Sequence, residues 1–578
     1  MAVIRLPSSV FRSGFALPLV IVAVIILVAL AVGLTMVSYG ARIQAARTKC
    51  ETAAMLAAEA GFEQGVFWMS KQSDIIGALQ NGANEGTIDF GDSSCSYLVD
   101  FEDFVSARPV FRIVSTGTSG NSSRVVDVAV IQAIDGWVMG KCRVPSGPTS
   151  TVPVYFGNGE IIDIPVHINN LKDSPDERDI YISGSPSFEQ KVEMGEPRRT
   201  TAGSDKYNSV MNLFNDGIYF DQPDVRITDE DAVESKVNRF RDSTNPAFRF
   251  TPVGNAQVSN PQKAVQLEFF VQDGVGKVRI TNNCTVRGYQ RTNNSTTQDY
   301  KITSGSNPQT YQRYYVYAYH YAPSNQAPVI YNLDDSYVTQ TFGTKQSDPG
   351  GQIFVDGNVI IGSEQYDQMT IKGKVTVVAT GNIWIGDSIL VDGDRNPATQ
   401  MPTDGNPNVL GLIAQGVVKV VDPGFSDYPE GGTNNYPGPA QGSIPDRFLP
   451  SSPQYNHNYK PIANGSGTNR VLPRTTIVEA AVTVGGGGWG AENVTRLYGS
   501  TWYGGRKQYG SASQDFLILR GTISECIRGV VGVLNRDGFI KQYYLDGRLL
   551  KGILPGDIWF GGKYVPAPAG WHDYRPEN

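Results

Sequence analysis

The first hydrophobic feature of the chain is an uncharged run from Phe15 to Val37, FALPLVIVAVIILVALAVGLTMV. An α-helix over this run would be about 35 Å long, which is enough to cross the hydrocarbon core of a bilayer. A cleaved secretory signal has a shorter apolar region of about 7–15 residues, followed by a small-residue cleavage site. The run therefore predicts a retained membrane anchor.

Beyond this run, apolar and small residues recur at a spacing of three and four positions, with Gln64 as the one interruption. They are Ile43, Ala46, Cys50, Ala53, Ala57, Ala60 and Phe67. This spacing is typical of one face of an α-helix that packs against a protein surface. We therefore predict one long helix over residues 15–80, which leaves the membrane and continues against a folded head.

The pattern then changes to a period of two, which is typical of β-strands. Val126, Val128 and Val130 alternate with Val125, Asp127 and Ala129, and the preceding runs are rich in β-branched and aromatic residues. Residues 81–143 are predicted to form a small antiparallel β segment. The Pro/Gly/Ser-rich stretch 144–153 is predicted to be a linker.

Residues 154–578 are predicted to form a large β-rich domain. Period-two patterning is sharpest between Ile353 and Ile389, and GNVIIG (357–362) recurs as GNIWIG (381–386). A repeat of this length suits one coil of a β-solenoid, with a curved sheet or a sandwich as the alternative. The expected fold class is α+β, mainly β, with a long N-terminal hydrophobic helix, a small antiparallel sheet and a large domain with β-solenoid-like character.

Composition and charge exclude several classes of protein. The chain has 578 residues and a formal charge of −7, with no long basic run after residue 50, so nucleic acid is not expected as a partner. The five cysteines and four histidines are dispersed, which disfavours zinc. A Cys95–Cys142 disulfide is one pairing open in an oxidising compartment, and Cys50 on the helix is the natural unpaired thiol.

The junction before the apolar run resembles the type IV prepilin signal. A short basic leader, residues 1–14, ends in Ser13-Gly14, and the apolar run starts at Phe15. The resemblance implies cleavage by a prepilin peptidase between Gly14 and Phe15. Leu19 then occupies the fifth mature position, where major pilins usually carry Glu to pair with the terminal amine of a neighbouring subunit. The string AAEAG (57–61) resembles the helix end of PilX-type N-terminal domains, and both features imply a minor or tip subunit.

Several strings in the large domain resemble an uncharacterised β-rich domain that often follows PilX-type leaders. They are GNGEIIDIPVHINN (157–170), SGSPSFEQKV (183–192), GIYFDQPDVRIT (217–228), GLIAQGVVKV (411–420) and the segment 521–559. The first string departs from that pattern, because Ile164 stands where Gly is usual. The resemblance implies no catalytic activity.

Three motifs match the sequence patterns of ligand sites only in part. GGGGWG (485–490) matches G-x-G-x-x-G but has no helical pattern after it, so it predicts a glycine loop and not a dinucleotide site. Asp392, Asp394 and Asn396 have calcium-like spacing, but an EF-hand loop would continue with Gly and later Glu. The acidic stretch 221–235 is typical of a solvated edge. No catalytic residue, metal or cofactor is predicted.

These observations predict a type IV pilus-related minor pilin or pseudopilin-like structural protein, not an enzyme. It would be a single-pass protein of the bacterial inner membrane with its bulk in the periplasm, and outside the cell when part of a pilus. Its expected partners are prepilin peptidase, other pilin subunits and the inner membrane; the β domain would serve assembly initiation or adhesion to an unidentified ligand. The alternatives are a membrane-tethered β-helical carbohydrate-active enzyme and an unprocessed envelope adhesin or scaffold.

Overall fold

The structure is a computed structural model of the whole chain. It describes residues 16–576 except for the following gaps: 73–74, 83, 106–107, 135, 146–150, 171–179, 198–206, 223, 226–236, 239, 243, 254–260, 291–299, 302–310, 313, 321–327, 334–350, 363–367, 421–458, 464–468, 474, 486, 492–494, 499–500, 505–515, 533–538 and 551–561.

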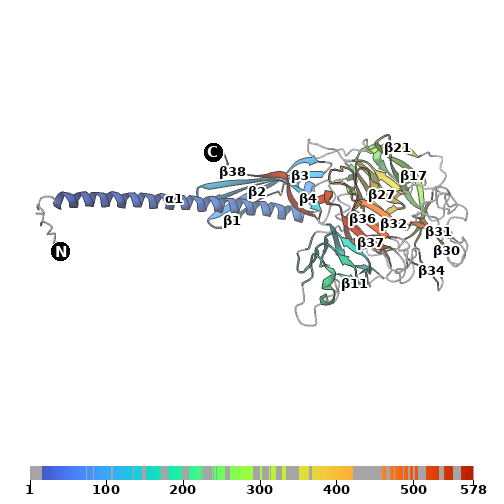
Figure 1. Cartoon of the computed structure of the whole chain (residues 1–578). Coiled ribbons are helices and arrows are strands. Elements are labelled where there is room, and N and C mark those ends of the chain that lie inside the picture. Colours follow the sequence, from blue (N-terminus) through green and yellow to red (C-terminus); the bar gives the residue numbers. More distant parts are fainter. Residues whose placement is uncertain are drawn as a thin grey trace.

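A single long helix, α1 (Ala16–Lys71), projects from the β part of the molecule like a rod (Figure 1). A short second helix, α2 (Ile75–Gln80), follows it. The run from Ala16 onward contains straight-chain and small residues that favour a helix, with Pro18 confined to the first turn, where its missing N–H costs no helical bond. The predicted long N-terminal helix is confirmed.

The C-terminal half of α1 packs on a five-stranded sheet, which we call the head sheet. Its order is β1-β2-β3-β4-β38, and every neighbouring pair is antiparallel. The first four strands follow one another along the chain, but β38 comes from the C-terminus. The bounds are β1 Glu85–Asp89, β2 Ser93–Val105, β3 Arg108–Ser119, β4 Ser122–Ile134 and β38 Gly562–Tyr574. This confirms an antiparallel sheet beside the helix, and the fifth strand is a finding that the sequence pattern did not indicate.

The rest of the chain, which we call the body, is built around a 15-stranded sheet. Its main path is β14-β13-β10-β5-β36-β32-β28-β25-β22-β15, and all these neighbours are parallel. The bounds are β5 Trp137–Lys141, β10 Val166–Ile168, β13 Val192–Met194, β14 Ile218–Tyr219, β15 Arg249–Phe250, β22 Gly351–Val355, β25 Lys374–Ala379, β28 Val409–Ala414, β32 Thr475–Val484 and β36 Phe516–Ile527. The predicted mainly-β fold class is confirmed.

The body consists of two runs of the chain that meet in the middle of this sheet. The first run (137–219) adds strands from β5 to β14 at one end, and the second run (249–545) starts at β15 and returns to β36. Strand β36 then pairs with β5, so residues far apart in the sequence, such as Ile523 and Trp137, become neighbours. We call this place the seam.

Within the first run, parallel partners are separated by a constant number of residues. Val166 pairs with Val192 and Val192 with Ile218, while Ile162 pairs with Phe188, which in turn bridges to Phe214. The second run also pairs in register, but its spacing is not constant: Val359 of GNVIIG pairs with Ile383 of GNIWIG, and Ile383 pairs with Val418 after a longer connection. The predicted repeat is therefore a set of in-register parallel strands, while the name β-solenoid stays a prediction.

An eight-stranded sheet lies beside the second run, in the order β20-β17-β16-β23-β26-β29-β33 with β21 on β17. Its bounds are β16 Pro261–Gln272, β17 Val275–Gln290, β20 Tyr314–His320, β21 Val329–Asn332, β23 Asn358–Ile361, β26 Ile383–Ile385, β29 Val418–Val420 and β33 Trp489–Ala491. One continuous apolar core, from Trp137 to Tyr543, fills the body, and a separate one lies under the head sheet.

Short elements complete the body. The predicted linker 144–153 contains β6 and β7, which form an antiparallel pair after the chain has already entered the large sheet through β5. The remaining bounds are β6 Arg143–Pro145, β7 Thr151–Pro153, β8 Tyr155–Phe156, β9 Ile161–Asp163, β11 Tyr181–Ile182, β12 Ser187–Phe188, β18 Tyr300–Lys301, β19 Tyr311–Gln312, β24 Gln368–Ile371, β27 Ser388–Val391, β30 Tyr459–Ala463, β31 Asn469–Pro473, β34 Thr495–Tyr498, β35 Thr501–Gly504, β37 Ile540–Leu545, η1 Asn208–Leu213, η2 Pro246–Phe248 and α4 Gly547–Leu550.

Candidate functional site: the N-terminal helix and the head sheet

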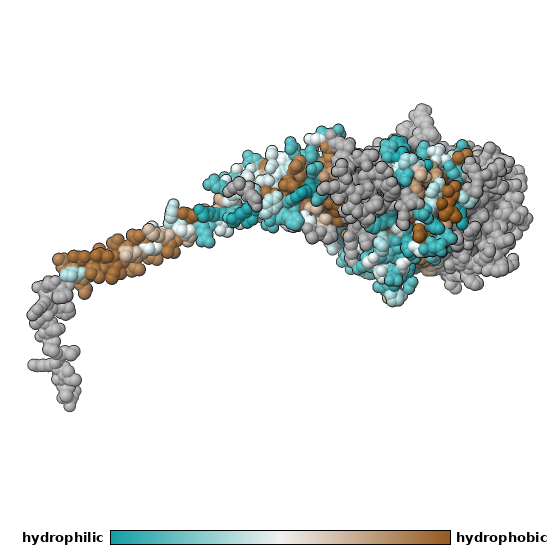
Figure 2. All heavy atoms as spheres, turned by 90° about the horizontal axis from the view of Figure 1, so that it is seen from above, coloured by the Kyte–Doolittle hydropathy of each residue, from teal (hydrophilic) through white to brown (hydrophobic). Residues whose placement is uncertain are grey.

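The first part of α1 is apolar around its whole circumference and touches no other element. The large hydrophobic side chains from Leu17 to Val37 are all exposed, and Figure 2 shows them as one continuous hydrophobic stretch. By length and composition α1 is the helix of the described chain that could cross a membrane. An apolar surface of this extent requires lipid or an apolar protein partner, because water solvates it poorly.

The predicted site residues all belong to this end of the chain. Gly14 and Phe15 lie outside the described residues, so the cleavage junction stays a prediction. Leu19 lies in the first turns of α1 and is 71% exposed. It therefore presents a branched apolar side chain to whatever surrounds the helix, and no carboxylate.

A polar stretch separates the apolar part of α1 from the head sheet. Residues 38–49 are exposed, and they carry Arg42, Arg47 and Lys49. The first acidic residue of α1 is Glu51, which forms a 2.8 Å ion pair with Arg575 of the C-terminal tail. The head sheet thus begins to contact α1 about 20 Å beyond the end of the apolar run, at 1.5 Å per helical residue.

Small residues line the face of α1 that packs on the head sheet. Ala54, Ala58 and Phe62 are buried, and the last two share a core with Ile113 and Val128 of the sheet. The stripe predicted from sequence is wrong at both ends, because Ile43 is 38% and Phe67 53% exposed, and Met69 is buried instead. Adjacent alanines at 53–54 and 57–58 fit two neighbouring faces of a helix, so the spacing alone did not select the buried one.

Two glycines set the distance between the helix and the sheet. A Cβ on Gly61, the last residue of AAEAG, would overlap the Ser115 hydroxyl. A Cβ on Gly117 of β3 would overlap the backbone of Ala54 and Ala58. At Gly117 the strand backbone therefore lies directly against the helix backbone, which only glycine allows, while Gly61 leaves room for the Ser115 side chain. The small residues of the AAEAG string therefore allow α1 to pack closely on the head sheet.

The C-terminal strand holds the helix from the other edge of the head sheet. The ring of Trp571 meets the ring of Phe62 edge to face, with centroids 5.1 Å apart. The register of β38 on β4 shifts between Pro566 and Trp571. Prolines are rare within strands, so the string KYVPAPAGW does not show the period-two pattern that predicts one. The aromatic residues Tyr564 and Trp571 near the C-terminus were the signal that could have indicated it.

Buried charges concentrate at the seam of the body. The carboxylate of Glu525 accepts hydrogen bonds from Trp137 Nε1 (2.8 Å) and from the backbone N–H of Trp489 (2.7 Å). Burial raises the pKa of Glu525 to about 7, and these donors offset only part of that rise. Lys541 forms a buried ion pair with Glu160, and burial lowers the pKa of Lys541 to about 8. These pairs join the second run to the first.

The motif with calcium-like spacing is held by an arginine and by amides of its own loop. Arg395 forms two hydrogen bonds to buried Glu479, of 2.5 and 2.7 Å. The Asp392 carbonyl accepts from Asn406 and Asn408, and the Asn396 side chain caps its own turn. Among the described residues no group of three His, Cys, Asp or Glu side chains could hold a metal ion.

The glycine run GGGGWG is also structural. A Cβ on Gly488 would overlap the backbone of Ile527 and Gly529, and one on Gly490 would overlap the Val530 carbonyl. A strand, β33, begins within the run at Trp489, where a nucleotide site would need a helix N-terminus. The run therefore lets two backbone segments approach each other beside Glu525.

The other candidates from sequence are accounted for in part. Asp224 accepts a 2.8 Å hydrogen bond from the Asn170 amide, while most of the acidic stretch, 226–235, lies outside the described residues. The Cys95–Cys142 pairing is wrong: Cys95 lies in the head sheet and Cys142 in the body, where its sulfur is 3.4 Å from that of Met139.

Comparisons with known proteins were made for the sequence and for the fold. No family model and no curated protein matches the chain. Among solved structures, the chain is similar to the competence-associated pilin ComZ from Thermus thermophilus, with 12% identity and a TM-score of 0.28 over 91% of this chain and 98% of that one.

Proposed function

We propose that the chain is a membrane-anchored, pilin-like structural subunit that carries a large β body on its head. The observation that supports this most directly is the division of α1 into two halves. The first half has no protein cover and is long enough to span a bilayer, and the second half is locked to the head sheet through Ala54, Gly61 and Gly117. Such a helix can be held by lipid before assembly and by neighbouring helices afterwards.

The proposal includes processing and a low-copy position. Prepilin peptidase would cut between Gly14 and Phe15, and the mature helix would then join a filament or its tip with other pilin subunits. Leu19 supplies no carboxylate for a neighbouring terminal amine, which favours a minor or tip position over the filament shaft. The body, whose ligand is unidentified, would face away from the membrane for adhesion or assembly initiation.

The proposal is tested by locating the protein in cells that make either the wild-type chain or the Gly14→Trp variant. We expect wild-type protein in the inner membrane and in the fraction sheared from the cell surface. Gly14→Trp should leave the inner-membrane signal and abolish the sheared-surface signal, because an uncut leader keeps Arg5 and Arg12 in front of the helix and outside a helix bundle. The matched control is Ser8→Trp within the leader, which should behave as wild type.

Two results would contradict the proposal. Wild-type protein confined to the soluble periplasm would exclude the anchor. Gly14→Trp protein present in the sheared fraction at the wild-type level would exclude processing at this junction, and would favour an envelope scaffold that assembles uncut.

A further inference from the structure

The body is inserted between two neighbouring strands of the head sheet. Ile134, the last residue of β4, pairs with Gly562, the first residue of β38. The chain leaves the head at the end of β4, enters the body within three residues at Trp137, and returns to the head only at Gly562. Both covalent connections therefore leave the head side by side.

Each connection leads into a different run of the body. Strand β4 continues directly into β5, the start of the first run. Strand β38 is preceded by α4 and β37, the end of the second run, and α4 contacts β4 of the head sheet. The two runs are joined at the seam, where Ile523 of β36 pairs with Trp137 of β5.

We propose that these two connections between the head and the body form one mechanical link, in which β4 and β38 carry tension between the body and α1 together and Arg548 anchors the β38 path inside the body. The inference goes beyond the proposed function. It concerns the mechanics of the folded chain, and it holds or fails whether or not the leader is cut.

The head sheet is arranged to resist this tension in shear. Pulling the body away from α1 draws β4 and β38 in the same direction, so the load falls on the β3–β4 ladder from Phe111 to Ser119 and on the contact with the helix. Ladder hydrogen bonds run perpendicular to the strands, so a pull along the strands loads many of them at once. Arg112 adds a two-point ion pair to Asp127 across the same ladder.

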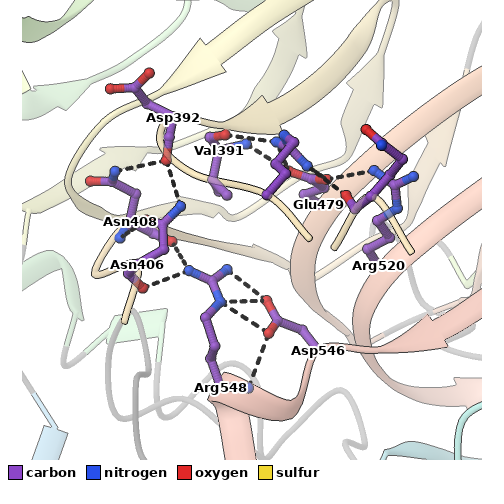
Figure 3. Close-up of polar contacts among 10 residues, drawn as sticks. Val391, Asp392, Asn406, Asn408, Glu479, Arg520, Asp546 and Arg548 are labelled. Carbon is purple, nitrogen blue, oxygen red and sulfur yellow. Dashed lines mark hydrogen bonds and ion pairs between the residues drawn. The ribbon is translucent and has the colours of Figure 1, made fainter. Parts of the chain in front are cut away.

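The anchor in the body is Arg548 with the groups that bind its guanidinium (Figure 3). Arg548 of α4 is buried, and its Nη1 donates to the backbone carbonyls of Asn406 (2.7 Å) and Asn408 (2.8 Å). Asp546 holds the other edge of the guanidinium. A buried arginine bound to two carbonyls ties the last turn of the second run to its interior strands, because breaking the contact leaves buried groups without partners.

These carbonyls belong to a loop that is itself fixed to the large sheet. The side chains of Asn406 and Asn408 donate to the Asp392 carbonyl at the end of β27, and Asn408 accepts from Gly373 before β25. Tension on α4 is thereby passed to strands in the middle of the second run and not to the end of one strand.

The test is force spectroscopy on the full chain in detergent micelles, with one handle at the N-terminus and one at the β16–β17 turn at Gly274. A protease site inserted between Ile134 and Trp137 allows the first connection to be cut, which leaves the β38 path alone. A site within 551–561 allows the second connection to be cut, which leaves the β4 path alone. We expect both cut forms to hold the body under load and the intact chain to hold it longest.

Two matched arginine variants separate the two paths. Arg548→Gln should raise the detachment rate at constant force about tenfold when only the β38 path is intact, and leave it unchanged when only the β4 path is intact. Arg528→Gln removes a buried arginine at the seam that also donates to carbonyls, those of Val154 and Tyr155, and should show the opposite preference. Asp546→Asn is the milder substitute if Arg548→Gln does not fold.

The outcomes are distinct. Equal effects of Arg548→Gln and Arg528→Gln in both cut forms would mean general destabilisation and would overturn the anchor. Release of the body without force after either cut would overturn the proposal that both connections carry tension.

Discussion

The head sheet and the body differ in how their β-strands are arranged and connected. Four of the five head strands are consecutive in sequence and antiparallel, and tight turns suffice to join them. The main path of the body is parallel, so its neighbours come from distant parts of the chain and each pair needs a long connection. The head is therefore a local structure with one strand borrowed from far away, whereas the body depends on contacts at long range.

The two regions also differ in the residues that make their closest contacts. In the head, glycine and alanine bring α1 onto the sheet, and the ion pair Arg112–Asp127 lies half in water. In the body, Glu525 and Arg548 are buried within the core region. Steric changes should consequently damage the head most, and changes in protonation should be felt in the body.

The largest effect is expected from a branched side chain at the helix–sheet contact. Gly117→Val should destabilise the head by more than about 3 kcal/mol, because its side chain must displace the backbone of α1 at Ala54 and Ala58. Valine is otherwise favoured in a strand, so any loss comes from overlap. Hydrogen exchange of β3 and β4 measures the effect.

The control for this change is Gly405→Val in the loop of the body, where a Cβ meets no atom within 4 Å. It should leave exchange in both regions unchanged. Equal protection of the head strands in Gly117→Val and wild type would show that α1 does not lie against Gly117.

The second effect is a pH dependence confined to the body. The pKa of Glu525 is raised to about 7 by burial, so the folded carboxyl keeps its proton between about 4.5 and 7 while the unfolded one loses it. The contribution of Glu525 to stability should therefore fall by on the order of 3 kcal/mol as pH rises through this window, and stay constant above it. Denaturant unfolding followed by the fluorescence of the adjacent Trp137 and Trp489 measures it.

Glu525→Gln is the variant that isolates this contribution, because glutamine resembles the protonated acid and does not titrate. We expect the fall between pH 4.5 and 7 to shrink in the variant, with head exchange unaltered. An identical pH profile in variant and wild type would assign the dependence to other groups.

The smallest effect is expected at the half-exposed ion pair of the head. The Arg112 side chain is 50% exposed, so solvent screens much of its attraction to Asp127. Arg112→Gln should cost the head about 0.5–1 kcal/mol in thermal unfolding. Arg241→Gln, which removes an exposed pair with Asp242 in the body, is the control and should cost less. A loss above that of Gly117→Val would reverse the ranking of contacts in the head.

Much of the fold could be predicted because its signals are local. The uncharged run to Val37 and the alternation at Val126, Val128 and Val130 depend only on neighbouring residues, and both predicted elements exist. The repeat of GNVIIG at GNIWIG indicated strand pairs that the structure places in register.

What the sequence could not indicate depends on distant residues. Strand β38 becomes a head strand only because β4 offers an edge, and the pairing of β36 with β5 joins segments separated by most of the chain. The spacing from Val166 to Val192 to Ile218 was present in the sequence but involves strands of two or three residues, too short for a period-two test. The helix face was misplaced because adjacent alanines at 53–54 and 57–58 fit two neighbouring faces of a helix equally well.

The central claim is that α1 is the helix of a processed pilin-like subunit, and the N-terminal residue of the mature chain tests it most directly. Mass spectrometry of the protein purified from its own membrane should give a chain that begins at Phe15. A chain that begins at Met1, with the leader intact in the assembled form, would contradict the account.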